Sequence, residues 1–269
     1  MYKNKNIAII GGGIIGLAVA YKLSLQNAIV HVFEKEAAVG LHQSGRNSGV
    51  LHCGLYYEPG SLKAQLSVNG IREMISFCQT HGIAHDVCGK VVVATTDKEV
   101  QALDQLASRG NQNGLKGLQY LTPEELKLRE PFVKAQKALL VPEEGIVDYK
   151  AVMHKMVDLI KQNDGQVSYN TQLSSVNQFN ENELILSTTK STHSFDYLIS
   201  CSGLWSDKTY KNLTQQNAPL RIVPFRGEYL KFKDGFEDRI NHLVYPVPDS
   251  NFPFLGVHFT RMIDGSREV

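Results

Sequence analysis

The sequence predicts an α/β fold in which a parallel sheet with its helices is interleaved with a second, sheet-rich region. Three observations near the amino end support it. The apolar run Ile7–Ile10 leads directly into Gly11-x-Gly13-x-x-Gly16. A helical pattern follows over about residues 14–26, and a second apolar run, Ile29–Phe33, ends at Glu34. This order of strand, glycine loop, helix, strand and acid is that of a Rossmann-like, dinucleotide-binding βαβ unit.

Each position of the glycine loop has a physical purpose. Gly11 permits the tight turn out of the first strand, and Gly13 lets a pyrophosphate approach the backbone. Gly16 allows the helix and strand to pack closely. The amides of Ile14 and Ile15 lie at the helix N-terminus, where free N–H groups and a partial positive charge favour phosphate.

An acid closes the second strand. Glu34 lies where a carboxylate accepts hydrogen bonds from ribose hydroxyls, and Lys35 follows it. An acid at this point favours the free adenosine ribose of FAD or NAD over the phosphorylated ribose of NADP. We therefore include both residues in the predicted cofactor site.

Composition excludes several classes of protein. The net charge is +1, charged residues make up 20% of the chain, and no long basic run predicts a nucleic-acid partner. No apolar stretch is long enough to span a bilayer, and the first strand is no signal peptide. The four cysteines lack CxxC or metal-type spacing, which predicts reduced thiols, no metal site and a cytoplasmic location.

The remaining chain alternates helices with short strands. A loop over residues 40–61, dense in glycine and polar residues, precedes a helix over about 62–81 that Gly82 ends. Thr96 and Glu99 form a capping box, and Thr122-Pro123 opens another helix. Asp148 precedes a longer helix that stops near residues 163–165. Strands are predicted at 87–95, 167–169, 173–179, 184–187, 195–200, 220–223, 228–232 and 255–259.

The segment Ser44–Ala64, SGRNSGVLHCGLYYEPGSLKA, resembles a signature of the L-2-hydroxyglutarate oxidase and dehydrogenase family. That family lies within the FAD-dependent D-amino-acid-oxidase-like superfamily. Pro224–Tyr229, Tyr245–Pro248 and Phe252–Met262 agree with it, so the resemblance extends over essentially the whole chain. Family members continue for roughly a hundred more residues, so part of the flavin domain is expected to be missing from this chain.

The resemblance implies a function and an organisation. FAD would oxidise L-2-hydroxyglutarate, a small 2-hydroxy dicarboxylate, to 2-oxoglutarate, and pass electrons to oxygen or to membrane quinone. Without a transmembrane segment, any contact with the inner membrane is peripheral. We expect residues 1–82 and 146–216 to form a discontinuous FAD-binding domain. Residues 83–145 and 217–269 then form an antiparallel, substrate-binding region.

Removing a hydride from the substrate carbon requires a base for the hydroxyl proton. His52 lies in the loop that the resemblance places beside the isoalloxazine ring, and His258 lies on the strand predicted at 255–259. Arg226 and Arg261 are the candidate clamps for a carboxylate, because guanidinium binds it in bidentate fashion. Tyr245 is a candidate hydrogen-bond donor to the substrate.

Other polar residues are assigned to the cofactor. These are Ser44, Arg46, Asn47 and Ser48 in the loop, whose hydroxyl, amide and guanidinium groups suit the pyrophosphate, the ribityl chain and the flavin edge. Ser202 and Gly203, after a second strand, present backbone groups, and the family analogy adds the backbone of Val176 at the adenine.

Three alternatives stay open. The chain could be an FAD-dependent amine, amino-acid or other 2-hydroxy-acid oxidase of the same superfamily. It could be an inactive remnant, as the early end of the chain suggests. An NAD-dependent dehydrogenase is compatible with the glycine loop, but it would not need the second cofactor-facing segment at residues 44–61.

Overall fold

The computed structural model describes residues 2–179, 183–249 and 256–269. They form two compact units, each assembled from two stretches of chain. Unit 1 comprises Met1–Asn47 and Tyr149–Arg226, and unit 2 comprises Ser48–Asp148 and Gly227–Val269. Residues 48–82 and 146–148, which were expected in the FAD-binding domain, cluster with unit 2, and residues 217–226, which were expected in the substrate-binding region, cluster with unit 1.

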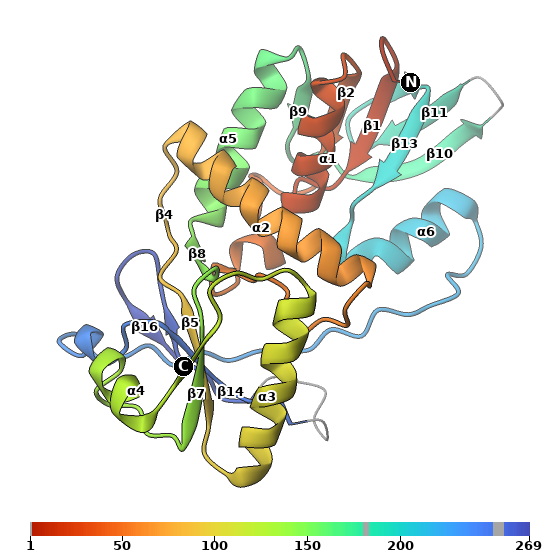
Figure 1. The fold of residues 1–269 in the computed structure, drawn as a ribbon. Coiled ribbons are helices and arrows are strands. Elements are labelled where there is room, and N and C mark those ends of the chain that lie inside the picture. The colour runs from red at the N-terminus through yellow and green to blue at the C-terminus, as the bar shows by residue number, and fades with distance from the viewer. Residues whose placement is uncertain (1, 180–182, 250–255) are drawn as a thin grey trace. The chain divides into compact units, whose positions relative to one another are not determined.

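A parallel four-stranded sheet organises unit 1 (Figure 1). Its order is β13 (Tyr197–Ser200), β1 (Asn6–Ile10), β2 (Ile29–Phe33) and β9 (Gln166–Ser168). β1 pairs in parallel with both β13 and β2, and it is buried except at its first residue. Near-continuous apolar strands of this kind are typical of parallel sheets covered on both faces.

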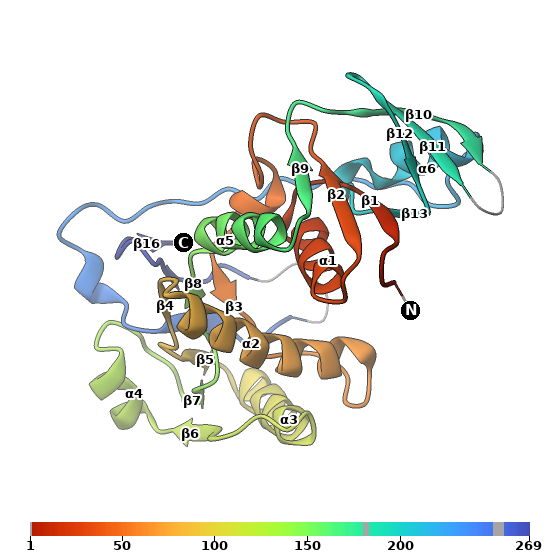
Figure 2. The ribbon, with the colours of Figure 1, turned by 90° about the horizontal axis from the view of Figure 1, so that it is seen from above.

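Helices cover one face of this sheet and a second sheet covers the other (Figure 2). The helices are α1 (Ile14–Ser24) and α5 (Tyr149–Gln162), which pack side by side. The second sheet is antiparallel, in the order β10 (Leu173–Phe179), β11 (Leu184–Thr188) and β12 (Thr192–Phe195). Its apolar side chains form one cluster with those of β1 and β2: Ala8, Ile10, Phe33, Leu173, Leu186 and Phe195.

The strand predicted at 195–200 is two strands in two sheets. Asp196 separates β12 from β13, and its backbone amide donates to the carbonyl of Asn6. Its carboxylate accepts from the Asn6 amide at 2.8 Å and pairs with Lys5. These contacts carry the chain out of the antiparallel sheet and into the parallel one. The short α6 (Ser206–Thr214) follows the turn η2 (Gly203–Trp205).

Unit 2 contains a mixed four-stranded sheet. Its order is β14 (Leu243–Pro246), β5 (Lys90–Ala94), β7 (Lys137–Val141) and β6 (Gln119–Leu121). β14 runs parallel to β5, whereas β7 is antiparallel to both of its neighbours. Because side chains alternate along a strand, Lys90 and Val92 share a face with their register partners Leu243 and Tyr245.

The helices of unit 2 begin and end at the predicted signals. α2 (Leu62–His81) is capped by Ser61 and ends at Gly82, which has a φ of 66°. α3 (Asp97–Gln112) and α4 (Pro123–Arg129) each begin with a complete capping box. Such boxes satisfy two of the orphan amides at a helix start. No helix within the described residues combines the length and apolar character needed to cross a bilayer.

Short strands complete unit 2. β8 (Gly145–Val147) lies between β3 (Val50–Leu51) and β4 (His85–Asp86), and β15 (Thr260–Arg261) pairs with β16 (Arg267–Glu268). The turns η1 (Gln43–Gly45) and η3 (Glu237–Arg239) are single 3-10 turns, the first in unit 1 and the second in unit 2.

Three predicted late strands need correction. Residues 220–223 form no strand, and Leu220 and Val223 are exposed, so no neighbour supplies the missing ladder. Of 228–232, only Lys231 forms a bridge, to Glu268. Of 255–259, Leu255 lies outside the described residues, and the regular strand begins only at Thr260.

Candidate functional site

In the glycine loop of unit 1, backbone atoms pack directly against backbone atoms, so a side chain on these glycines would clash. Gly11 has a φ of +111°, and a Cβ there would lie 2.4 Å from the carbonyl oxygen of Cys201. A Cβ on Gly16 would lie 2.0 Å from the carbonyl oxygen of Gly11. β1, the start of α1 and the end of β13 thus meet at contact distances that only glycine allows.

Glu34 ties this loop to the second strand. It is 7% exposed, its Oε2 accepts from the Gly12 amide at 2.6 Å, and its Oε1 accepts from the Glu36 amide at 2.8 Å. A carboxylate oxygen has two lone pairs, so each oxygen can still accept a hydrogen bond from a ligand. Glu34 therefore shapes the loop in addition to its predicted contact with ribose.

The N-terminus of α1 faces a polar partner. Gly13 is the N-cap residue, and no side chain caps the helix from that position. Instead the Oγ of Ser44 accepts a hydrogen bond from the Ile14 amide at 3.0 Å. The first-turn amides of a helix have no intrahelical acceptor, so this end is suited to an anion.

A cavity of about 810 Å³ opens over the loop. This is within the range of small-molecule sites. Among its lining residues are eight of those predicted to bind the cofactor: Gly11, Gly13, Ile15, Glu34, Lys35, Ser44, Ser202 and Gly203. The structure thus brings together, around one space, residues from three separate segments of the chain.

Other predicted cofactor residues lie elsewhere. Arg46 and Asn47 are exposed and absent from the cavity lining, and the Asn47 amide donates to the carbonyl oxygens of Gln43 and Ser44. Val176 packs against the apolar cluster between the two sheets of unit 1. Ser48 belongs to unit 2.

The cavity also has a wall in which only Lys35 was predicted from the sequence. The ring of Trp205 lies beneath two ammonium groups, Lys35 Nζ at 3.9 Å and Lys208 Nζ at 4.1 Å from its centroid. All three residues line the cavity, as do Lys211 and Asn212. In the sequence, this wall could have been recognised from the largely polar segment 206–214, which follows the predicted cofactor residues Ser202 and Gly203.

Unit 2 contains a buried ion pair that sequence analysis also missed. Lys90 and Glu144 are both 0% exposed, and the Lys90 ammonium pairs with Oε2 of Glu144. Burial alone would raise the pKa of Glu144, but the charge of Lys90 and the contact with His52 outweigh it and lower that pKa to about 2. Glu144 is thus a carboxylate at neutral pH.

His52 lies against this pair. Its Nδ1 is 3.3 Å from Oε2 of Glu144 and 3.3 Å from Nζ of Lys90. The neighbouring Cys53 Sγ donates to Oε1 of Glu144 at 3.2 Å, and burial together with that carboxylate raises the pKa of the thiol. His52 is therefore held against a dense polar cluster, while its own side chain is 43% exposed.

Aromatic rings surround the same cluster. Lys90 Nζ lies 4.2 Å from the ring centroid of Tyr245 and 5.2 Å from that of Tyr56. The Tyr56 hydroxyl is buried and finds no hydrogen-bond partner within the described residues. His258 lies with its ring centroid 4.3 Å from that of Tyr245. The structure thus brings the predicted residues His52, Tyr245 and His258 together in unit 2.

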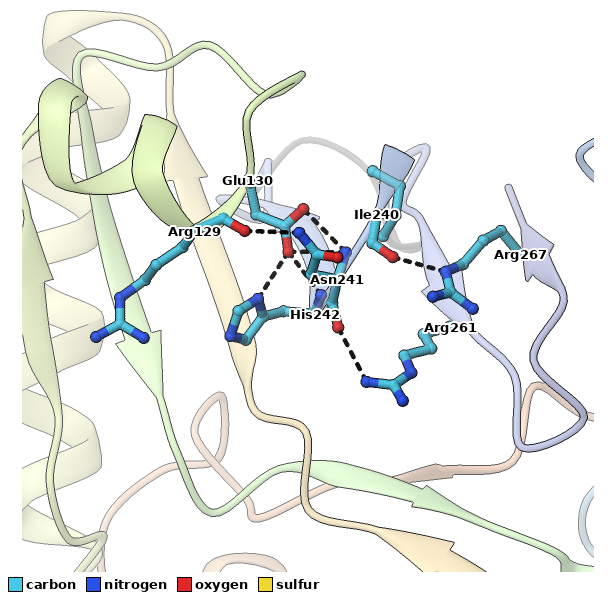
Figure 3. A network of polar contacts seen from close by, with 7 residues as sticks. All are labelled: Arg129, Glu130, Ile240, Asn241, His242, Arg261 and Arg267. Carbon is cyan, nitrogen blue, oxygen red and sulfur yellow. Dashed lines mark hydrogen bonds and ion pairs between the residues drawn. The ribbon is translucent and has the colours of Figure 1, made fainter. Parts of the chain in front are cut away.

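The two candidate arginine clamps are placed differently. Arg261 pairs with Asp86 at 3.0 Å, and its Nη1 donates to the carbonyl of Asn241 at 3.4 Å (Figure 3). The Asn241 amide in turn donates to the buried carboxylate of Glu130. Arg226 is exposed at the end of unit 1.

Comparison with known proteins supports FAD as the cofactor. The chain matches the model of the DAO family, described as FAD dependent oxidoreductase, over residues 6–267. It is 46% identical over 265 residues to an L-2-hydroxyglutarate dehydrogenase of Indibacter alkaliphilus, and the alignment covers 98% of this chain and 66% of that protein. An Escherichia coli protein of the same name is 41% identical, and the alignment covers 98% of this chain and 63% of that protein. This chain therefore spans somewhat less than two thirds of the length of these relatives.

Solved structures share the fold. An FAD-bound L-α-glycerophosphate oxidase of Mycoplasma pneumoniae superposes with a TM-score of 0.83 at 24% identity, covering 99% of this chain and 71% of that one. A glycine oxidase of Geobacillus kaustophilus superposes with a TM-score of 0.82 at 19% identity, covering 98% of this chain and 70% of that one. At these identities the likeness establishes the fold alone.

Proposed function

Since this chain belongs to the DAO family of FAD-dependent oxidoreductases, we propose that it oxidises L-2-hydroxyglutarate to 2-oxoglutarate with FAD as cofactor. The identity to relatives named for that substrate supports the substrate. The cavity over the glycine loop is the single structural observation that carries the cofactor assignment.

The residues present fit an adenine dinucleotide. The Cβ positions of Gly11 and Gly16 are filled by backbone, so the loop can adopt its shape only without side chains there. The α1 amides and Ser44 would hold the pyrophosphate, and Glu34 would hold the ribose. Unit 1 is thus the proposed cofactor-binding part, and unit 2 the proposed substrate-binding part.

Bound FAD would supply the acceptor for the hydride that leaves the substrate carbon. The protein must then accept the hydroxyl proton, and we assign this to the Nε2 atom of His52, because the carboxylate of Glu144 can hold the imidazole proton on Nδ1 and leave Nε2 unprotonated. His258 is the second candidate base, although its Nδ1 lies 2.8 Å from the carbonyl oxygen of Gly256. Tyr245 would orient the substrate from the same cluster.

A guanidinium clamp would hold the substrate carboxylates. Arg261 has five N–H donors, of which Asp86 and Asn241 engage only part, so it can also bind a carboxylate. Arg226 is the proposed second clamp. Electrons would leave the reduced cofactor to oxygen or to a membrane quinone, with peripheral membrane contact in the second case.

An absorbance experiment tests this proposal. The chain purified with FAD should be yellow and should bleach anaerobically on addition of L-2-hydroxyglutarate. Bleaching with glycine, sarcosine or glycerol-3-phosphate instead would assign it to another activity of the superfamily. A spectral change with NAD and substrate, or a chain that stays colourless after FAD is added, would contradict the proposal.

A further inference from the structure

The imidazole of His52 has two oppositely charged partners at one nitrogen. Nδ1 lies 3.3 Å from the carboxylate oxygen Oε2 of Glu144 and 3.3 Å from the ammonium nitrogen of Lys90. The two partners also pair with each other. Lys90 can donate to an unprotonated Nδ1, and Glu144 can accept from a protonated one.

The pair is far more buried than the histidine. The side chains of Lys90 and Glu144 are 0% and 1% exposed, against 43% for His52. Lys90 comes from β5 and Glu144 from the residue before β8, so two separate elements fix the pair in place. The Glu144 backbone adds to this, because its carbonyl accepts from the Gly89 amide at 2.8 Å.

Other groups that face His52 carry no charge at neutral pH. The ring centroid of Tyr245, on β14, lies 6.2 Å from that of His52, and the thiol of the adjacent Cys53 donates a hydrogen bond to Glu144. Burial raises the pKa of both groups. The buried Tyr56 faces Lys90 rather than the imidazole. The charges that act on His52 from its described surroundings are therefore those of Lys90 and Glu144.

We propose that Lys90 and Glu144 are positioning residues for His52: the Glu144 carboxylate accepts a hydrogen bond from Nδ1–H, Lys90 holds that carboxylate in place, and the unprotonated Nε2 is left to accept the proton of the substrate hydroxyl. This role deepens the proposed function and depends on it for its catalytic meaning. The hydrogen bond made at one ring nitrogen decides which nitrogen carries the proton, as in hydrolase triads where a buried acid orients the histidine.

The two partners favour opposite tautomers of the neutral ring. Glu144 accepts from Nδ1–H and leaves Nε2 unprotonated, whereas Lys90, donating to Nδ1, would place the proton on Nε2. Removing the Glu144 carboxylate should therefore move the population of His52 toward the Nε2–H tautomer.

Nuclear magnetic resonance of the chain, with histidine labelled by ¹³C and ¹⁵N, tests the proposal without turnover. A His52→Gln variant assigns the signal. At alkaline pH we expect the ¹⁵N shifts of His52 to show the Nδ1–H tautomer in the wild-type chain and a larger share of the Nε2–H tautomer in Glu144→Gln. Lys137→Met, at the other end of the β5–β7 ladder, is the matched control and should leave the tautomer unchanged.

An unchanged tautomer in Glu144→Gln would overturn the proposal. Should the variant fail to fold, the wild-type chain still decides, because the Nε2–H tautomer of His52, or the averaged mixture of a free histidine, would contradict the role. In the active holoenzyme we expect kcat to fall about tenfold or more in Glu144→Gln with KM little changed. The expected tautomers without any bleaching by L-2-hydroxyglutarate would overturn only the proposed function.

Discussion

The carboxylate of Glu34 and the amide of Gly12 are joined by a 2.6 Å hydrogen bond that links the end of β2 to the glycine loop. The second carboxylate oxygen accepts from the Glu36 amide. One buried side chain therefore fixes the loop that follows β1 and the turn that follows β2. The geometry of the proposed FAD site depends on this link.

Glu34→Gln tests that link. The amide has the same shape, but its NH₂ group must face one of the two backbone donors, which leaves that donor unsatisfied at a cost of about 1–3 kcal/mol. We expect FAD affinity, measured by fluorescence titration, to fall about tenfold. Glu58→Gln, at a side chain 78% exposed, should leave the affinity unchanged. An equal loss in both variants would contradict a specific role for Glu34.

Gly16→Ala should destabilise the chain even though alanine is the better helix former. Its Cβ would lie 2.0 Å from the Gly11 carbonyl oxygen, so backbone must move, at about 1–3 kcal/mol. Gly70→Ala is the matched control, because Gly70 lies in α2 and, apart from its chain neighbours and the backbone of its own helix, no atom lies within 4 Å of the new Cβ. It should stabilise by up to about 1 kcal/mol. Urea denaturation measures both, and stabilisation of both would refute the close contact.

Glu130→Ala should destabilise the chain more than Glu124→Ala, although both glutamates lie in or beside α4. Glu130 is 0% exposed and accepts from the amides of Asn241 and His242 and from the His242 ring at 2.7 Å (Figure 3). Removing it leaves buried donors without partners, so we expect a loss of about 3 kcal/mol or more. Glu124→Ala, exposed in the first turn of α4, should cost at most about 1 kcal/mol. Similar melting temperatures for the two variants would contradict this network.

His31 should make the stability of the chain depend on pH. Burial, with a smaller effect of His193, lowers its pKa from 6.5 to about 4. Between these values the unfolded chain binds the proton and the folded chain does not, so this contribution to stability is present above pH 6.5 and is lost as the pH falls to 4. His31→Gln should flatten the dependence in that window, measured by urea denaturation at several pH values. His154→Gln, at an exposed position on α5, should not.

Local signals predicted most helices and the first βαβ unit. Thr96, Glu99 and Gly82 mark helix ends through hydrogen bonds and a left-handed φ that involve only neighbouring residues. Strand runs were less reliable, because a strand also needs a partner. Residues 195–200 form one apolar run, yet Asp196 diverts the chain between two sheets. Leu220–Val223 reads as a strand and has no ladder at all.

The residues of the candidate sites also differ in how far the sequence alone reveals them. The glycine loop and Glu34 could be found because their spacing is short and carries its own chemistry. Lys90 and Glu144 could not, because they are 54 residues apart and each looks like an ordinary surface charge beside an apolar strand. Only the fold places them together under His52. Lys208 and Trp205 were missed for a similar reason, since Lys208 looks like an ordinary surface charge of α6 and Trp205 lies in the short turn η2 before that helix.

We expect the cavity over Gly11–Gly16 to hold FAD, and a crystal structure of this chain grown with FAD would show whether it does. The diphosphate should lie on the amides at the start of α1, and the adenosine ribose should lie beside Glu34. A diphosphate bound at any other place on the chain would rule out this cofactor site.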